Sequence, residues 1–348
     1  MPLKIKTNAS SSRLLAPYSV KRNLPENYNE KDKFLFEHER QRQFGEVFLA
    51  VFSNAIFYPY GFFKAENEFF INNLFYQKKI DFLTKIKEKI KAELVFKKKR
   101  IEGSSLTICD DFTNGYFHWF GDAFPRLQLA LRQKIKFDRL LLPDRLAKLE
   151  YALTSLKAFG DLQYLIVDQN EKVICERLLV ISPIAPTGNY HPLIMQELRS
   201  LFLKTFQPHL TEPKLKVYIS RQKALRRRVA NEKDILKLLT SFNYEIVFTE
   251  EMSLAEQIRL MANSKVLISL HGAGLTNMLF MQPGSKIVEL RFPHDSHNNC
   301  YFSLASALCH KYYYLVGEET NSKVDPHKDD LLVNVNRLEY LLERLEEE

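Results

Sequence analysis

The stretch that decides the fold is VLISLHGAGLTN, residues 266–277. The apolar run 266–270 indicates a buried strand, and the glycines at 272 and 274 permit a tight turn before a helix over 275–281. Ligands of open α/β sheets bind beyond the carboxyl ends of the strands. A helix start offers unpaired N–H groups and a positive dipole end, which favour anions, and a histidine adds a donor for a phosphate oxygen. We predict a pyrophosphate site formed by His271, Gly272, Ala273, Gly274, Leu275, Thr276 and Asn277. The alternative is a glycine-rich connector with a packed histidine.

The pattern around this stretch predicts a doubly wound domain. Strands are expected at 216–220, 244–249, 265–270 and 286–290, with helices at 232–242 and 253–263 between them. Asn231 is the expected N-cap of the first helix, and Ser253 with Glu256 has the spacing of a capping box at the second.

A basic segment, SRQKALRRR at 220–228, follows the first of these strands. Guanidinium groups bind phosphate oxygens in a bidentate way. The end of this strand should lie near the loop at 271–274, so Arg221, Arg226 and Arg227 are predicted to grip the same diphosphate. The alternative is a set of solvated loop charges.

The N-terminal part of the chain predicts a second Rossmann-like half. Strands are expected at 106–109, 139–142, 164–167 and 177–181, with helices at 116–133 and 144–159. A hairpin is expected within 44–70, turning at Pro59-Tyr60-Gly61, and a helix over 73–98. The predicted domains are 1–210 (1–100 irregular or hairpin, 105–205 Rossmann-like) and 214–328. An amphipathic helix at 329–348 is a candidate to pack back on the N-terminal domain.

A third motif, NGYFHWFGD at 114–122, places His118 and Asp122 four residues apart. On a helix the two side chains share a face and can touch. Such a pair can act as a general base with its neighbour. The alternative is a core histidine on an aromatic helix.

Charge, cysteine content and the distribution of apolar residues indicate the kind of partner and the compartment to expect. The net charge is +8, and the basic excess gathers in Lys85–Arg100, which reads as a solvated helix face or a contact for an anionic partner. The four cysteines have no zinc-ligand spacing, and their low density favours a reducing compartment. We find no signal peptide and no membrane span, and we expect a cytoplasmic protein.

With these segments in view, the sequence resembles glycosyltransferase family 61 over about residues 105–317. The most specific part of the resemblance is Ser220-Arg221 with the arginine cluster, Asn231-Glu232, Glu256-Gln257 and HGAGLTN at 271–277. Phe280, Pro283-Gly284 and Val288-Glu289 continue it, and the stretches 116–119 and 122–126 look like the family's first-domain signature.

The resemblance implies a GT-B fold, with two Rossmann-like domains facing a cleft, and an inverting transfer from a nucleotide sugar, a UDP-sugar, without a metal or other cofactor. The chain has no DxD motif, which agrees with a metal-independent site. Asp122 is the favoured base, with His118 as its neighbour, and Glu256 and Glu289 are candidate contacts for the nucleoside. Lacking an evident signal or anchor, the chain looks like bacterial members that build capsule or lipopolysaccharide. Its acceptor would be a glycan or lipid-linked glycan.

Two other functions remain open from the sequence. The first is another GT-B-like transferase of polysaccharides, such as a pyruvyltransferase. The second is a non-catalytic, basic nucleic-acid-binding protein, although no helix-turn-helix, RRM or zinc module is apparent and we expect no nucleic-acid partner.

Overall fold

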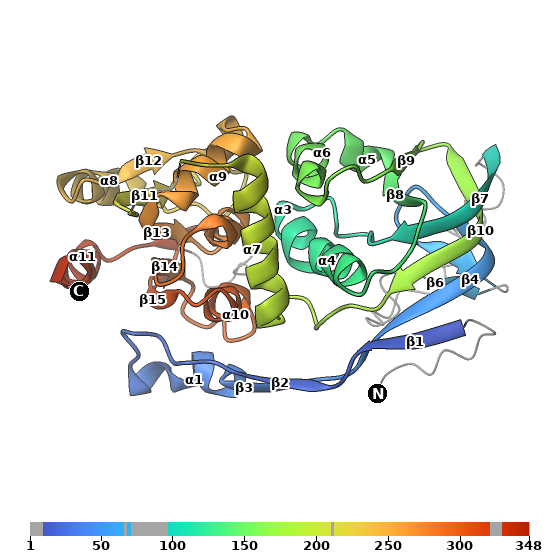
Figure 1. Ribbon diagram of the computed structural model, residues 1–348. Helices are drawn as coiled ribbons and strands as arrows, with labels where there is room; N and C mark the ends of the chain where they lie inside the picture. The colour runs from blue at the N-terminus through green and yellow to red at the C-terminus, as the bar shows by residue number, and fades with distance from the viewer. Residues whose placement is uncertain (1–9, 66–67, 71–96, 210–211, 321–328, 348) are drawn as a thin grey trace. The chain divides into compact units, whose positions relative to one another are not determined.

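The computed structural model describes residues 10–65, 68–70, 97–209, 212–320 and 329–347. The chain forms two compact units (Figure 1). The first contains the N-terminal residues up to Ser19 and then Gln43–Thr187, and the second contains Val20–Arg42 and Gly188–Glu348. The protein is a mixed α/β protein, as the sequence predicts, but the division differs from the predicted domains because the second unit includes an early segment of the chain.

The first unit is built on a mixed sheet. Antiparallel strands on one side are joined through β4 to parallel strands on the other. In spatial order the strands are β6 (Glu68–Phe70), β5 (Phe63–Ala65), β4 (Val47–Phe57), β10 (Glu171–Ile181), β7 (Lys97–Thr107), β8 (Arg139–Pro143) and β9 (Tyr164–Val167), and β1 (Ser10–Leu15) also pairs with β4. The four strands predicted between 106 and 181 are β7, β8, β9 and β10, and they are parallel to one another as the sequence predicts. The antiparallel strands that extend this sheet come from residues 10–70. The hydrophobic core of this unit is formed by buried side chains of the sheet, such as Phe52, Val173 and Leu178.

Local predictions in the first unit have mixed outcomes. The hairpin is confirmed, because β4 pairs antiparallel with β5 around a turn at 59–61. The helix predicted over 73–98 lies mostly outside the described residues. Its last two positions begin β7, so Lys97–Arg100 is an exposed strand end and not a helix face.

The predicted helix at 116–133 is present but interrupted. It consists of α3 (Tyr116–His118), a π-helical turn over Trp119–Ala123 and α4 (Phe124–Arg132). Trp119 is fully buried, and its indole N–H donates to the Ser155 hydroxyl at 2.9 Å. This bond links the π-helical turn to α6 (Glu150–Leu156), which follows the short α5 (Asp144–Ala147).

The second unit is the predicted doubly wound domain. Its sheet is parallel throughout, in the order β12 (Glu245–Val247), β11 (Leu215–Ile219), β13 (Ser264–Leu270), β14 (Lys286–Arg291) and β15 (Lys311–Val316). Strand β13 is buried on both faces, and its alternate residues Val266, Ile268 and Leu270 face one layer of helices. This arrangement brings the ends of β11 and β13 together at the centre of the sheet.

Helices cover both faces of this sheet (Figure 1). One face packs against α8 (Glu232–Ser241) and α11 (Val335–Glu347). The other carries α7 (Pro192–Phe206), α9 (Leu254–Ala262), α10 (Cys300–Ala307) and a 3-10 helix over Ala273–Phe280.

Two domain predictions need correction. The leucines of α11 at 338, 341, 342 and 345 are buried against the sheet of the second unit, so this helix does not pack on the N-terminal domain. Helix α7 also belongs to the second unit, because the composition break at 207–214 marks the end of a helix and not a domain boundary.

The early segment Val20–Arg42 joins the second unit through buried contacts. It holds the end of β2 (Tyr18–Lys21), the short α1 (Lys33–Phe36) and the start of β3 (Gln41–Phe44). Phe36 packs on Phe302 and Tyr314, with ring centroids 5.3 and 4.7 Å away. Arg22 forms a buried ion pair with Glu39 at 2.9 Å and donates to Asn189 at 2.8 Å.

Among the described residues, no helix has both the length and the apolar character needed to cross a membrane.

Candidate functional site

The candidate site of the second unit lies where the strand order reverses. Numbered along the chain, its five strands run 2-1-3-4-5, so the switch point falls between β11 and β13. The segment 220–228 leaves the end of β11, and the segment 271–274 leaves the end of β13. These are the two segments that the sequence predicts to lie together, and the topology of the sheet does bring them to one edge.

Arg221 and Gly272 are in direct contact at this point. A Cβ atom added to Gly272 would lie 2.2 Å from a terminal nitrogen of Arg221 and 2.8 Å from its guanidinium carbon. The backbone at Gly272 is extended, with φ 168°, so glycine is needed there for close approach and not for a turn. Gly274 has the same role, since its Cβ would lie 3.0 Å from Ile219 Cγ2.

Backbone carbonyl groups of the loop after β11 hold the Arg221 side chain in place. The Arg221 Nε donates to the Arg227 carbonyl at 2.8 Å, and a terminal nitrogen donates to the Arg226 carbonyl at 3.3 Å. Burial lowers the pKa of Arg221, and the nearby Arg227 guanidinium lowers it further. Two like charges held this close favour an anion between or beside them.

The other arginines of the cluster differ in their surroundings. Arg226 is exposed and makes no side-chain hydrogen bond or ion pair with the described part of the chain. Arg227 has a left-handed backbone, φ 56°, and its Nε is buried without a hydrogen-bond partner in that part. Arg228 instead forms an ion pair with Asp330 at 3.1 Å, so it anchors the loop to the segment before β17 (Leu331–Leu332).

His271 is oriented by a buried acid. Its Nδ1 is hydrogen-bonded to a carboxylate oxygen of Glu289, which is fully buried. The other carboxylate oxygen accepts from the Tyr312 hydroxyl and from Arg291. Burial raises the pKa of Glu289, but Arg291 and then His271 outweigh it, so the pKa is lowered and the carboxylate is charged. The charged partner fixes the His271 tautomer with Nδ1 protonated, which leaves Nε2 for other chemistry.

The environment of Glu289 corrects its predicted role. A side chain with no exposed surface, whose carboxylate already binds three groups, cannot contact the ribose of a nucleoside. Glu256 has a local role as well. It completes the predicted capping box, accepting from the Ser253 backbone and hydroxyl at 2.8 and 2.7 Å. Asn231 lies at the N-cap of α8 without capping it, because its amide pairs with the backbone of Val333.

The helix predicted at 275–281 is a 3-10 helix over Ala273–Phe280. Leu275, Thr276 and Asn277 are 0%, 2% and 1% exposed. The Asn277 amide donates to Gln257, whose own amide donates to the carbonyls of Thr249 and Met252. These side chains hold neighbouring loops in place, and the half-exposed Ala273 and Gly274 are the positions that a ligand can approach.

The candidate base lies in the first unit. His118 Nδ1 and an Asp122 carboxylate oxygen are 2.7 Å apart, and the same oxygen accepts from the Thr187 hydroxyl at 3.2 Å. The side chains of His118 and Asp122 are 26% and 13% exposed, so both reach solvent. Asp122 lies within the π-helical turn, and such turns are frequent at functional sites.

A buried ion pair supports this turn. Arg126 donates to the Asp122 carbonyl at 3.0 Å and to an Asp110 carboxylate oxygen at 3.0 Å. Burial raises the pKa of Asp110, but Arg126 outweighs it, so the pKa is lowered and the carboxylate stays charged. Next to the His118–Asp122 pair, Phe112 is 49% exposed, and its ring centroid lies 5.3 Å from that of His118.

Comparison with known families decides which kind of protein carries these two clusters. Residues 116–288 match the model of the family described as glycosyltransferase 61. This region of the chain belongs to glycosyltransferase family 61. The matched region of family 61 contains the His118–Asp122 pair, the arginine loop and the turn at 271–274.

The curated relatives that match this chain include animal proteins named EGF domain-specific O-linked N-acetylglucosamine transferase. The rat (Rattus norvegicus) protein is 28% identical over 152 residues, which is 42% of this chain and 28% of the relative. The Bos taurus protein is 31% identical over 97 residues, 26% of this chain and 18% of its own length. The Drosophila melanogaster protein is 35% identical over 91 residues, 25% and 17% of the two chains. The match therefore covers less than a third of each relative's length.

Several residues that contact the site were not predicted from the sequence. Thr187 reaches Asp122 from 65 positions away, and Tyr312 reaches Glu289 from the neighbouring strand β15, whereas Arg291 lies two positions further along β14 itself. Contacts between positions so far apart cannot be predicted from local spacing in the sequence. The one available signal was at Glu289 and Arg291, since charged residues at alternate positions of a buried strand need partners.

Within the described ranges, no group of three or more His, Cys, Asp or Glu side chains is placed to hold a metal ion.

Proposed function

We propose that this protein is an inverting glycosyltransferase that uses a nucleotide sugar and needs no metal ion. The observation that carries the proposal is the contact of Arg221 with Gly272 at the switch point, beside Arg227 and His271. A diphosphate is the anion that best fits two guanidinium groups and a histidine at this edge of a parallel sheet.

In this proposal the second unit stabilises the leaving group. As the bond between the anomeric carbon and the phosphate oxygen breaks, negative charge builds up on the diphosphate. Arg221, Arg227 and the more exposed Arg226 are positioned to neutralise it, and preorganised donors act strongly in such a partly buried site. His271, held by Glu289 through Nδ1, would direct its Nε2 toward a phosphate oxygen.

The first unit would supply the base. Asp122 takes the proton of an acceptor hydroxyl, and the resulting oxygen nucleophile attacks the anomeric carbon from the side opposite the diphosphate. The new C–O bond forms as the old one breaks, which inverts the anomeric configuration. His118 and Thr187 orient the Asp122 carboxylate through their hydrogen bonds. This chemistry requires a GT-B arrangement, with acceptor and donor on different units, and we include that arrangement in the proposal.

The names of the relatives supply the first substrates to test. They support N-acetylglucosamine as the transferred sugar, with UDP as its carrier, and the hydroxyl of an EGF-like domain as one acceptor class. A glycan or lipid-linked glycan of a bacterial surface polysaccharide, the acceptor class that the sequence suggested, is the second. Under that second acceptor class, we propose a cytoplasmic enzyme in peripheral contact with the inner membrane face.

The experiment begins with thermal-shift screening against UDP, GDP, CMP, TDP and their sugars, because a ligand of the native state raises the melting temperature. Phosphoenolpyruvate serves as the comparison for a pyruvyltransferase. Transfer from the best donor to both acceptor classes is then followed by NMR, which reads the anomeric configuration of the product. An inverted product in the presence of EDTA is expected. A retained configuration, a requirement for added metal, or stabilisation by phosphoenolpyruvate alone would contradict the proposal.

A further inference from the structure

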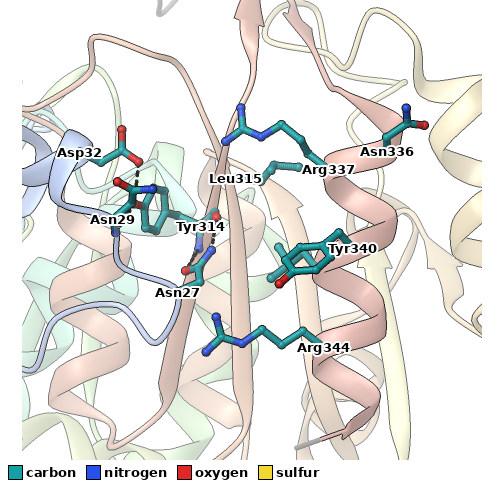
Figure 2. Close-up of a pocket in the computed structure, with 10 residues that line it drawn as sticks. Asn27, Asn29, Asp32, Tyr314, Leu315, Asn336, Arg337, Tyr340 and Arg344 are labelled. Carbon is teal, nitrogen blue, oxygen red and sulfur yellow. Dashed lines mark hydrogen bonds between the residues drawn. The ribbon is translucent and has the colours of Figure 1, made fainter.

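A pocket in the second unit lies between two segments that are far apart in the sequence. One wall is helix α11, which presents Arg337, Tyr340 and Arg344, and the other is the segment 27–32. Figure 2 shows the three side chains of the helix reaching toward the wall that holds Asn27, Asn29 and Asp32, where the Tyr314 side chain lies beside Asn29 and Asp32. The cavity has a volume of about 390 Å³, which is within the range of small-molecule sites.

The wall opposite the helix is rigidly built. The Asn27 amide donates to the Tyr314 carbonyl at 2.7 Å and accepts from the Tyr314 backbone N–H at 3.1 Å, so it extends the edge of β15. The Tyr314 hydroxyl donates to Asp32 at 2.7 Å and accepts from the backbone N–H of Asn29 at 3.3 Å. The Asp32 carboxylate is therefore engaged within its own wall.

The helix wall carries positive charge and an aromatic ring. Arg337, Tyr340 and Arg344 share one face of α11 because they are spaced three and four residues apart. The two arginine positions are separated by two helical turns, about 10 Å along the axis. Arg337 donates to the Val316 carbonyl at 3.3 Å and forms no ion pair with any described carboxylate. Arg344 donates to the Glu26 carbonyl at 3.1 Å.

Tyr340 is 71% exposed, although it is a large aromatic side chain in the middle of an ordered helix. The adjacent Leu341 and Leu342 form the buried stripe that anchors α11, so the fold does not need the tyrosine ring. An exposed ring flanked by two guanidinium groups offers a flat apolar surface between two cations that donate hydrogen bonds to anions.

From this arrangement we infer that the pocket binds an acidic saccharide of one or two rings. The apolar C–H face of a pyranose packs on the Tyr340 ring, and its carboxylate or phosphate bonds to Arg337, with Arg344 at the other end. The Asn29 side-chain amide supplies hydrogen-bond donors for hydroxyl groups. The inference goes beyond the proposed transferase activity, because binding here requires neither donor nor turnover.

The test is isothermal titration calorimetry of the full chain with glucuronate and with glucose 1-phosphate, using glucose and inorganic phosphate as the partial probes. We expect saturable binding of the acidic sugars, at least fivefold weaker binding of glucose, and at least fivefold weaker binding of the acidic sugars by Arg337→Ala and Tyr340→Ala. Both residues are exposed, so these variants should keep the wild-type melting temperature. Arg259→Ala, on an exposed position of α9, is the matched control and should bind like the wild type.

Arg221→Ala separates this pocket from the proposed donor site and should also bind the acidic sugars normally. The inference is overturned if neither acidic sugar binds, if glucose binds equally well, or if inorganic phosphate binds as tightly as the sugars. It is overturned as well if binding is lost in Arg221→Ala but retained in Arg337→Ala. Failure of the transfer assay leaves every one of these readouts unaffected.

Discussion

The guanidinium of Arg221 occupies the space that a side chain at residue 272 would need. An added Cβ would lie 2.2 Å from its terminal nitrogen. Because the glycine backbone is extended, the whole requirement for glycine comes from this contact.

Replacing Gly272 by alanine should displace Arg221 without unfolding the protein, since the end of an arginine side chain can move aside. We expect UDP affinity to fall about tenfold, which is roughly 1.4 kcal/mol. Gly45→Ala is the control, because an added Cβ there meets nothing within 4 Å. Equal UDP affinity in Gly272→Ala and the wild type would mean that the position of Arg221 is irrelevant to binding.

Asp122→Asn should remove the base while preserving the shape of the side chain. The expected loss in kcat is about 10²- to 10⁴-fold, with the KM for the donor nearly unchanged, because the pair lies in the unit that does not hold the diphosphate. Thr187→Val, which removes one hydrogen bond to the same carboxylate, should lower kcat by a smaller factor. Steady-state kinetics with saturating donor measure both, and wild-type turnover by Asp122→Asn would remove this residue from the mechanism.

Glu289→Gln should destabilise the fold, because it leaves Arg291 buried without its charged partner. Breaking a buried ion pair costs roughly 3–5 kcal/mol, whereas the surface pair of Lys223 and Glu251 should contribute less than about 1 kcal/mol. Urea unfolding of Glu289→Gln and of Glu251→Gln compares the two. A small effect at both positions would show that the buried network contributes little to stability.

Acid should weaken the fold through a buried histidine. Burial lowers the pKa of His310 from 6.5 to about 4. The unfolded chain therefore binds a proton at pH values where the folded chain does not, and the free energy of unfolding falls as the pH drops from 6.5 to 4. The total loss is about 3 kcal/mol, with a slope approaching 1.4 kcal/mol per pH unit. His310→Gln removes this titration, so urea unfolding between pH 7 and pH 4.5 should show a shallower slope than the wild type. Identical slopes would contradict the assignment.

The sequence predicts the second unit better than the first for a physical reason. Each strand near residues 217, 246, 268 and 288 is short, apolar and followed by a helix, and a parallel βαβ unit has few other ways to fold. In the first unit the long strands β4 and β10 pair across more than a hundred residues, and no local pattern fixes that register.

The site shows the same contrast. His118 and Asp122 are found because helical spacing alone brings them together. The predicted ribose contact of Glu289 is excluded because this side chain is fully buried among His271, Arg291 and Tyr312. The side chains of Leu275 and Asn277 are buried in a 3-10 helix, and their diphosphate contacts stay predictions. The segment 20–42 and the saccharide pocket it completes depend on contacts with β15 and α11, which no motif encodes.

The most direct measurement is the affinity for UDP of Arg221→Ala, with Arg259→Ala as the matched loss of an exposed arginine. Losing a charge-assisted hydrogen bond to the diphosphate costs about 1.5–3 kcal/mol, so calorimetry should show binding weakened roughly 10- to 100-fold in Arg221→Ala and unchanged in Arg259→Ala. If Arg221→Ala binds UDP as tightly as the wild type, the switch point is not the diphosphate site.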